Sequence, residues 1–178
     1  MPDKIENARE ILLEHGRAML LQSGYGGLKV RDVTRQCGMA SGTFYSYFQN
    51  KDELVFQLMD QGWSSLFEKI RVAMGSELPL HDKLAVTFRE IDTRERIYRA
   101  VFAETPVVPD RFAVYYLECM TRMDQIFEKI LSAEAEAGRI QLPVSPRKTA
   151  HIMTRFFMSA VGDPEIDFED LWRLMRLS

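Results

Sequence analysis

The chain has 178 residues, of which 46% are hydrophobic and 28% are charged, and its formal net charge is −3. This balance is typical of a globular protein with one large or two small domains. No window approaches the roughly eighteen apolar residues of a membrane span, and the first ten residues are too polar for a secretory signal. We therefore expect a cytoplasmic protein.

The cysteines and histidines form no metal-binding or disulfide pattern. Cys37 and Cys119 lie far apart, and neither belongs to a C-x-x-C pair. His15, His81 and His151 are scattered, and no glutamate precedes any of them at the spacing of a di-iron bundle. A nucleophile elbow and a dinucleotide loop are also absent from the sequence. We expect no metal, no cofactor and no enzymatic activity.

The positive charge is concentrated in a short stretch of this acidic chain. Residues 24–51 hold four cations and one anion, a net charge of +3, on Lys29, Arg31, Arg35, Lys51 and Asp32. A local basic patch suffices for nucleic-acid binding, because affinity depends on the charge near the phosphates.

The first predicted helix begins near Ile5 and ends at Ser23-Gly24. Apolar residues recur along it at steps of three and four, and a glycine can adopt the left-handed conformation that ends a helix. The next residues, Tyr25-Gly26-Gly27, are predicted to form a loop. A phosphate-binding loop is the alternative, but no strand precedes it and no third glycine follows at the required spacing.

Two short helices are predicted next, the first beginning at Val30 and closed by Gly38, the second beginning at Ser41. Phe44 and Phe48 lie four residues apart and therefore on one side of the second helix. Two short helices that are joined by a glycine-containing turn and packed on a third form a helix-turn-helix.

Polar residues occupy the remaining faces of that second helix. Hydroxyl groups suit phosphate oxygens and base edges, and a glycine lets the backbone approach a duplex. These residues are Ser41, Gly42, Thr43, Tyr45, Ser46 and Tyr47. Lys51 stands in the first turn of the following helix, where a cation opposes the helix dipole at a cost of a few tenths of a kcal/mol. Binding of a phosphate would explain it, and a solvated lysine without a role is the alternative.

The rest of the chain is also predicted to be helical, which makes the fold all-α. Asn50 and Glu53 have the spacing of a capping box at the start of a long helix. The helices are predicted over residues 50–74, 84–104, 110–138, 146–161 and 164–178, with a break at Thr105-Pro106.

Residues 12–54 resemble the DNA-binding domain of the TetR (tetracycline-repressor-like) regulators. The most specific part of the match is Gly42-Thr43-Phe44-Tyr45-Ser46-Tyr47-Phe48, followed by Lys51-Asp52-Glu53-Leu54. Beyond the first third of the chain, the similarity lies only in length and helical character. The resemblance implies a helix-turn-helix DNA-binding domain over residues 1–50 and a helical effector-binding and dimerisation domain over residues 51–178.

The resemblance also implies roles for individual residues. Tyr45 and Tyr47 would touch phosphates or thymine methyls, and Lys51 would clamp the DNA backbone. The implied DNA-binding set is Lys29, Ser41, Gly42, Thr43, Tyr45, Ser46, Tyr47 and Lys51. Lys29 stands where the family usually has a capping serine or threonine, so that helix start should be weaker, although its charge can still reach DNA. Ala40 stands where a capping serine is usual, and Ser41 could take over by shifting the cap by one residue.

The last two predicted helices each carry an apolar stripe. The first stripe is Ile152, Met153, Phe156 and Ala160, and the second is Phe168, Leu171, Trp172 and Met175. Because the family pairs its last long helices in a four-helix bundle, we expect these stripes to form a homodimer interface. Closure of the core of a single chain is the alternative.

Between the long helix and this pair, the sequence is rich in aromatic and methionine side chains, which suit an apolar ligand. The predicted effector pocket comprises Trp63, Phe67, Phe88, Phe102, Tyr116, Cys119, Met120 and Met123. An ordinary helical core is the alternative for each of them taken singly.

The resemblance thus implies a bacterial-type transcriptional repressor that binds a palindromic DNA operator as a homodimer. A small, largely apolar effector would move the two recognition helices apart and release the DNA. The alternative is a constitutive DNA-binding or interaction protein without a small-molecule effector.

Overall fold

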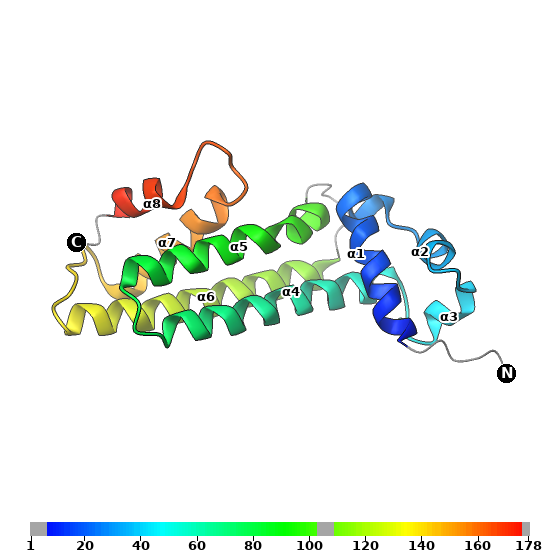
Figure 1. Cartoon of the computed structure of the whole chain (residues 1–178), viewed down its shortest axis with the longest axis horizontal. Coiled ribbons are helices and arrows are strands. Elements are labelled where there is room, and N and C mark those ends of the chain that lie inside the picture. The colour runs from blue at the N-terminus through cyan, green and yellow to red at the C-terminus, as the bar shows by residue number, and fades with distance from the viewer. Residues whose placement is uncertain (1–6, 103–108, 176–178) are drawn as a thin grey trace. The chain divides into compact units, whose positions relative to one another are not determined.

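The structure, a computed structural model, describes residues 7–102 and 109–175, without the side chains of residues 93–96 and 98. The helices are α1 (Ala8–Gly27), α2 (Val30–Gln36), α3 (Ser41–Tyr45), α4 (Lys51–Met74), α5 (Leu80–Phe102), α6 (Asp110–Glu136), α7 (Pro146–Ala160) and α8 (Phe168–Met175) (Figure 1). The described residues contain no strand, and the predicted all-α fold is confirmed. Within the same ranges, no helix is long and apolar enough to cross a bilayer. Ile5, Glu104 and the predicted break at Thr105-Pro106 lie outside the described residues.

The chain divides into two compact units. The first comprises residues 1–64 and 96–112, and the second comprises residues 65–95 and 113–178. The first unit therefore contains more than the predicted DNA-binding domain of residues 1–50, since the first half of α4 belongs to it.

In the first unit, α1 is broken at Gly24, whose φ of 69° lies in the region that favours glycine. The helix was predicted to end there, but Tyr25, Gly26 and Gly27 form a further helical turn instead of a loop. A Cβ atom on Gly16 would lie 2.7 Å from Leu54 Cδ2, so the glycine lets α1 pack closely on α4. The core of this unit includes Leu12, Leu20, Leu28, Val33, Phe44, Phe48, Leu54 and Leu58, all fully buried.

The starts of α2 and α3 lack side-chain caps, as the residues at these positions predict. Lys29 and Ala40 are the N-cap residues, and neither side chain accepts a hydrogen bond from its helix. Ser41 is the first residue of α3, so the cap does not shift onto it. At α4, Asn50 Oδ1 accepts a hydrogen bond from Glu53 N at 2.9 Å, which confirms half of the predicted capping box. The Glu53 carboxylate accepts from Gln49 N instead of Asn50 N.

In the second unit, the aromatic side chains of α5 to α8 form a connected core. Phe157 of α7 is fully buried, and its ring lies 5.3 Å from Phe88 of α5 and 5.4 Å from Phe127 of α6. The ring of Phe168, the first residue of α8, lies 6.1 Å from the same Phe157. The Phe157 ring thus contacts a ring on each of α5, α6 and α8, so one buried side chain connects four helices.

Helix α8 begins at Phe168, four residues later than predicted. Asp167 Oδ1 accepts a hydrogen bond from Asp170 N at 2.9 Å, and Asp170 Oδ2 accepts from Asp167 N at 3.3 Å. This reciprocal pair satisfies the free amide groups at a helix start, as a capping box does. The two aspartates therefore fix where α8 begins.

Candidate nucleic-acid interface

The turn between α2 and α3 depends on Gly38. Its φ is 65°, in the left-handed region, and a Cβ atom there would meet nothing within 4 Å. There is room for a side chain, but any other residue would be strained at this φ, so the backbone conformation alone explains the glycine. The next residue, Met39, is buried, and its amide donates to Thr34 O at 2.8 Å. These contacts set the direction in which α3 leaves the turn.

Helix α3 is anchored by Phe44 and Phe48. Both side chains are fully buried, and their ring centroids lie 5.3 Å apart. The regular helix ends at Tyr45, and the chain continues as a turn in which Phe48 N donates to Phe44 O at 2.9 Å. Tyr47 therefore lies beyond the end of the helix on which it was predicted.

The predicted DNA-contact residues of α3 lie on its outward side. Tyr45 is 60% exposed although it is aromatic, and Ser41, Gly42 and Ser46 are exposed as well. A Cβ atom on Gly42 would meet nothing within 4 Å, so its backbone is open to a close approach. Thr43 is half-buried, as is Tyr47 in the turn that follows. The structure thus brings six hydroxyl and glycine residues together beside a buried aromatic pair.

One of these hydroxyl groups already has a partner. Ser46 Oγ donates to Gly42 O at 3.3 Å, one helical turn earlier. The Ser46 hydroxyl is therefore used inside the helix, while its oxygen can still accept a hydrogen bond.

The cations of α2 differ in what they face. Lys29 and Arg31 are exposed, whereas Arg35 pairs with Asp32 at 2.8 Å and loses part of its local charge. The sequence indicates Arg31 only as part of the local net charge, and no DNA contact is predicted for it. Its place in the first turn of α2, two residues after Lys29, could have suggested that the two cations act together.

Lys51 has partners within the chain. Its Nζ donates to Tyr25 O at 3.0 Å and lies 4.1 Å from the centroid of the Tyr25 ring. Tyr25 is buried, and its hydroxyl donates to a carboxylate oxygen of Asp52. Burial, followed by the hydrogen bond and the charge of Asp52, raises the pKa of Tyr25 well above its ordinary value. The alternative of a solvated lysine without partners therefore does not hold, and the phosphate contact stays a prediction.

The predicted effector-pocket residues are distributed over both units. Trp63 and Phe102 belong to the first unit, where Trp63 is buried and Phe102 half-buried. The six in the second unit are all buried or half-buried: Phe67, Phe88, Tyr116, Cys119, Met120 and Met123. Their burial fits either a ligand site or a packed core.

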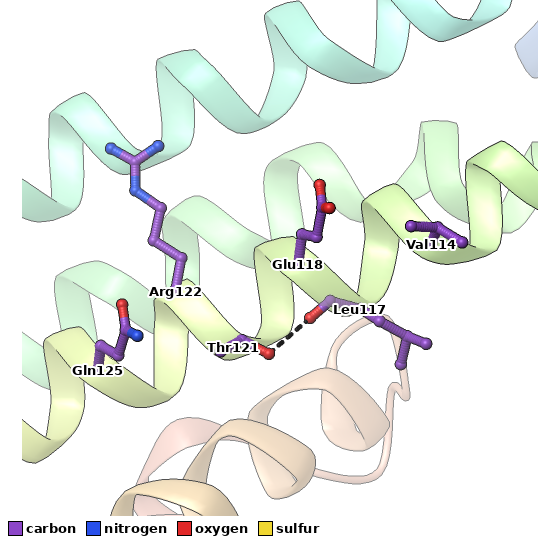
Figure 2. A pocket seen from close by; sticks show the side chains of 6 residues that line it. All are labelled: Val114, Leu117, Glu118, Thr121, Arg122 and Gln125. Atoms are coloured by element: carbon purple, nitrogen blue, oxygen red, sulfur yellow. Dashed lines mark hydrogen bonds between the residues drawn. The ribbon is translucent and has the colours of Figure 1, made fainter.

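The second unit has a surface hollow of about 480 Å³, but none of these residues lines it. Figure 2 shows its six lining side chains, all on α6: Val114, Leu117, Glu118, Thr121, Arg122 and Gln125. The guanidinium of Arg122 lies 4.1 Å from the centroid of the Phe67 ring. A hollow that is lined by one helix and wide open to solvent does not enclose a ligand.

The predicted dimer stripes are divided between the core and the surface. Met153, Ala160 and Leu171 are buried within the single chain, where they help to close its core. For these three residues, burial favours the alternative of a core in a single chain. Ile152 is 47% exposed and Phe156 is 41% exposed. On α8, the remaining residues Phe168, Trp172 and Met175 are half-buried.

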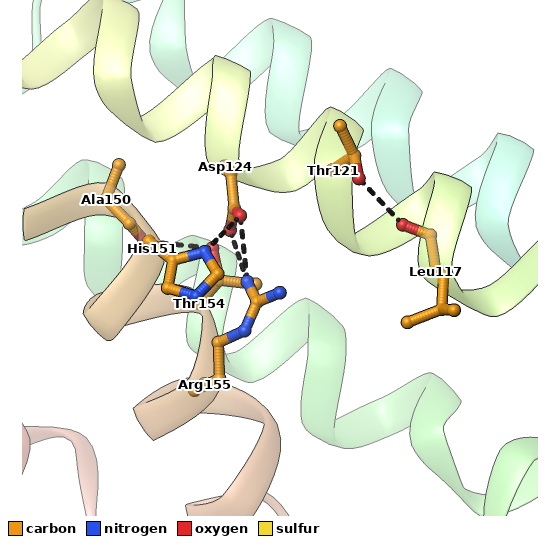
Figure 3. Close-up of polar contacts among 7 residues, drawn as sticks. All are labelled: Leu117, Thr121, Asp124, Ala150, His151, Thr154 and Arg155. Carbon is orange, nitrogen blue, oxygen red and sulfur yellow. Dashed lines mark hydrogen bonds and ion pairs between the residues drawn. The ribbon is translucent and has the colours of Figure 1, made fainter. Parts of the chain in front are cut away.

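An ion cluster ties α7 to α6 beside Ile152 and Phe156. Arg155 Nη1 donates to both carboxylate oxygens of Asp124, at 2.7 and 2.8 Å, and His151 Nδ1 lies 2.9 Å from Asp124 Oδ2 (Figure 3). The two α7 side chains, four residues apart, thus converge on one α6 carboxylate. His151 and Arg155 are exposed, like Ile152 and Phe156, whereas Met153 and Phe157 are turned inward.

Comparisons with known proteins agree with the resemblance in the sequence. Residues 12–58 match the family model of bacterial regulatory proteins, tetR family. The uncharacterized HTH-type transcriptional regulator YhgD of Bacillus subtilis is 24% identical over 179 residues, 95% of this chain and 93% of its own. The HTH-type transcriptional repressor DhaR of Mycobacterium sp. (strain GP1) is 22% identical over 158 residues, 86% of this chain and 80% of its own.

The fold agrees as well. The crystal structure of the regulatory protein TetR from Rhodobacter sphaeroides has a TM-score of 0.78 at 16% identity, and the match covers 96% of this chain and 97% of that one. The residues that match the family model include α2, α3 and the turn at Gly38. These relatives are regulators and not enzymes. Residues 12–58 thus carry the helix-turn-helix DNA-binding domain of the TetR family of transcriptional regulators, and the chain has the fold of a solved TetR regulator.

Proposed function

We propose that this regulator is a repressor that binds a palindromic operator as a homodimer, with α3 of each subunit in the major groove. The observation that carries the proposal is the outward side of α3, where Tyr45 is 60% exposed while Phe44 and Phe48 are buried. An exposed tyrosine with a free outward edge suits phosphate oxygens and thymine methyls. The assignment as a repressor is supported by the relative DhaR, which is named a repressor.

The proposed DNA contacts follow from exposure and chemistry. Tyr45, Thr43 and Gly42 face base edges and the nearest phosphates, while Lys29, the N-cap residue of α2, and Arg31 in its first turn neutralise phosphates. The other proposed contacts are Ser41, Tyr47 and the Ser46 oxygen. Lys51 belongs to the same interface by position.

A second copy of the chain is proposed to dock on the outward face of α7. Ile152 and Phe156 are apolar and exposed there, and Val114 and Leu117 of α6 are apolar and exposed in the same unit. One helix-turn-helix makes too few contacts for high specificity, so two half-sites about one DNA turn apart are needed. The half-buried side chains of α8 would extend this surface.

The effector is proposed to be small and largely apolar. Rings and thioethers such as Phe67, Met120 and Met123 are buried in the second unit, and such walls suit apolar ligands. We assign DNA binding to residues 1–50, and effector binding and dimerisation to residues 51–178. An effector that prefers the DNA-incompetent spacing of the two recognition helices would release the operator.

Selection of bound duplexes from a random-sequence pool tests the proposal directly. We expect the purified protein to enrich a two-fold symmetric sequence with half-sites about one helical turn apart. Native mass spectrometry and a release assay with a library of apolar compounds then test the effector. Enrichment of no sequence would overturn operator binding, and stable binding throughout the library would favour the constitutive alternative.

A further inference from the structure

We infer that Lys51 supports DNA binding through Tyr25, as a positioning residue, and is not a direct clamp on a DNA phosphate. Lys51 and Asp52 are the first two residues of α4, and Tyr25 lies in the last turn of α1. Together they fix α1 on α4 at the point where the chain turns toward α2 and α3. This inference rests on the proposed DNA-binding function and deepens it.

Tyr25 is held from α4 at three places. Lys51 Nζ donates to its carbonyl oxygen at 3.0 Å, and the same ammonium lies 4.1 Å from its ring centroid. The phenol hydroxyl donates to the Asp52 carboxylate. Two adjacent residues of α4 thus hold the backbone, the ring face and the ring tip of a single residue.

The remaining edge of the Tyr25 ring is also packed within the first unit. The Phe112 ring lies 5.8 Å away and nearly perpendicular to it, at 88°. Phe112 is fully buried and stacks on Phe56 of α4, with ring centroids 6.2 Å apart. Because Tyr25 follows the break at Gly24, it cannot gain its position from continuous helix geometry. The contacts of Lys51 and Asp52 with Tyr25, which we call the α4 clamp, fix its position instead.

The clamp also explains why a cation stands in the first turn of α4, where it opposes the helix dipole. A carbonyl oxygen and an aromatic face both attract an ammonium group, and together they offset that repulsion without a phosphate. The bond to Tyr25 O uses one of the three N–H groups of the Lys51 ammonium, the Tyr25 ring lies beside it, and the residue is half-buried. Lys29 differs, since its side chain is exposed.

The salt dependence of DNA affinity separates the two roles. A direct phosphate contact contributes a slope of about 0.9 in log K against log salt, whereas a positioning contact contributes none. We expect Lys51→Met to weaken binding of the selected duplex roughly tenfold with an unchanged slope. Lys29→Met is the matched control and should lower the slope by about 0.9. Fluorescence anisotropy over a salt series measures both.

The partner of Lys51 supplies the second arm of the test. Tyr25→Leu should cause a loss at least as large as that of Lys51→Met, and the double variant should lose less than the sum of the two, because both changes remove the contact between the ammonium and the ring. Lys51→Arg keeps a cation beside the ring and should bind more tightly than Lys51→Met. Thermal melts identify any variant that fails to fold. If Tyr25→Leu does not fold, Tyr25→Phe, which removes only the Asp52 bond, takes its place with a smaller loss.

The outcomes distinguish this inference from the proposed function. If Lys51→Met lowers the slope as much as Lys29→Met does, and Tyr25→Leu binds normally, Lys51 contacts phosphate and the inference is overturned while DNA binding stands. Strict additivity of Lys51→Met and Tyr25→Leu would also overturn it. If the unsubstituted protein binds neither the selected nor a mixed-sequence duplex, the proposed function itself fails.

Discussion

Helices α3 and α7 each carry two neighbouring aromatic side chains that face in different directions. Phe44 of α3 is buried beside the exposed Tyr45, and Phe157 of α7 is buried beside the exposed Phe156. Successive side chains on a helix point about 100° apart, so one ring faces the core and the other faces outward. The outward rings differ in chemistry. Tyr45 has a hydroxyl that suits phosphates, whereas Phe156 has no polar group and is stabilised only when its ring is buried. The pair therefore suggests nucleic acid as the partner of α3 and protein as the partner of α7.

The largest expected effect on stability comes from a substitution on the inward side of α3. Phe44→Ala removes a fully buried ring, and we expect the free energy of unfolding to fall by about 3–5 kcal/mol. Tyr45→Ala, the matched control one residue away, should change it by less than about 0.5 kcal/mol apart from helix propensity. Urea denaturation of both variants provides the measurement. Equal losses would mean that α3 is not divided into an inward and an outward side.

The outward ring of α7 provides the next test. Phe156→Asp places a charge on the proposed dimer surface and should weaken association by about 2 kcal/mol or more while the subunit stays folded. Leu78→Asp is the control, because Leu78 is exposed in the connector between α4 and α5. Sedimentation over a concentration series should show monomers for the first variant only. Dimers that persist in Phe156→Asp would place the interface elsewhere.

The hydroxyl of Tyr45 should matter less. If it bonds a phosphate, Tyr45→Phe removes one hydrogen bond to a charged group and weakens binding of the selected duplex by about 1.5 kcal/mol. The thermal midpoint should not move, since the ring is exposed and loses no core contact. Fluorescence anisotropy titration with the selected duplex measures the change in affinity. Unchanged affinity would restrict Tyr45 to contacts made by its ring, such as those with thymine methyls.

The helices and the outward side of α3 could be predicted because their signals are local. The break at Gly24 and the cap at Asn50 each depend on residues within one or two turns. The separation of Phe44 and Phe48 from the hydroxyl residues follows from helical periodicity alone. The start of α8 could also have been found, because Asp167 and Asp170 have capping-box spacing.

What the sequence did not reveal depends on contacts between distant residues. Lys51 and its partner Tyr25 are 26 positions apart, and their contact requires the helix break at Gly24. On α7, the stripe joined Ile152 to Met153, although neighbours on a helix face different directions. Only the packing of α7 on α6 determines which of the two is turned inward. Periodicity predicts that a face is apolar, but not whether the same chain covers it.

The smallest expected effect concerns His81, which connects α5 to α8 in the unit that contains α7. His81 Nδ1 lies 2.9 Å from Asp82 Oδ1, and Nε2 lies 2.9 Å from Glu169 Oε1 of α8. The ring also meets Phe168 and Trp172 edge-on, at 5.2 and 5.0 Å. The hydrogen bond with Asp82, followed by that with Glu169 and against partial burial, raises the pKa of His81 above 6.5.

Because the folded chain holds this proton more tightly, the stabilisation is complete below pH 6.5 and is lost as the pH rises through the raised pKa. We therefore expect the free energy of unfolding to decline slightly above neutral pH, and His81→Gln to flatten that decline. His15→Gln serves as the control for loss of an imidazole elsewhere in the chain. Urea denaturation across this pH range measures the difference. If His81→Gln and the unsubstituted protein follow parallel curves, the contact of His81 with Glu169 does not hold α8 in place, and α8 depends on the contacts of Phe168 with Phe88 and Phe157.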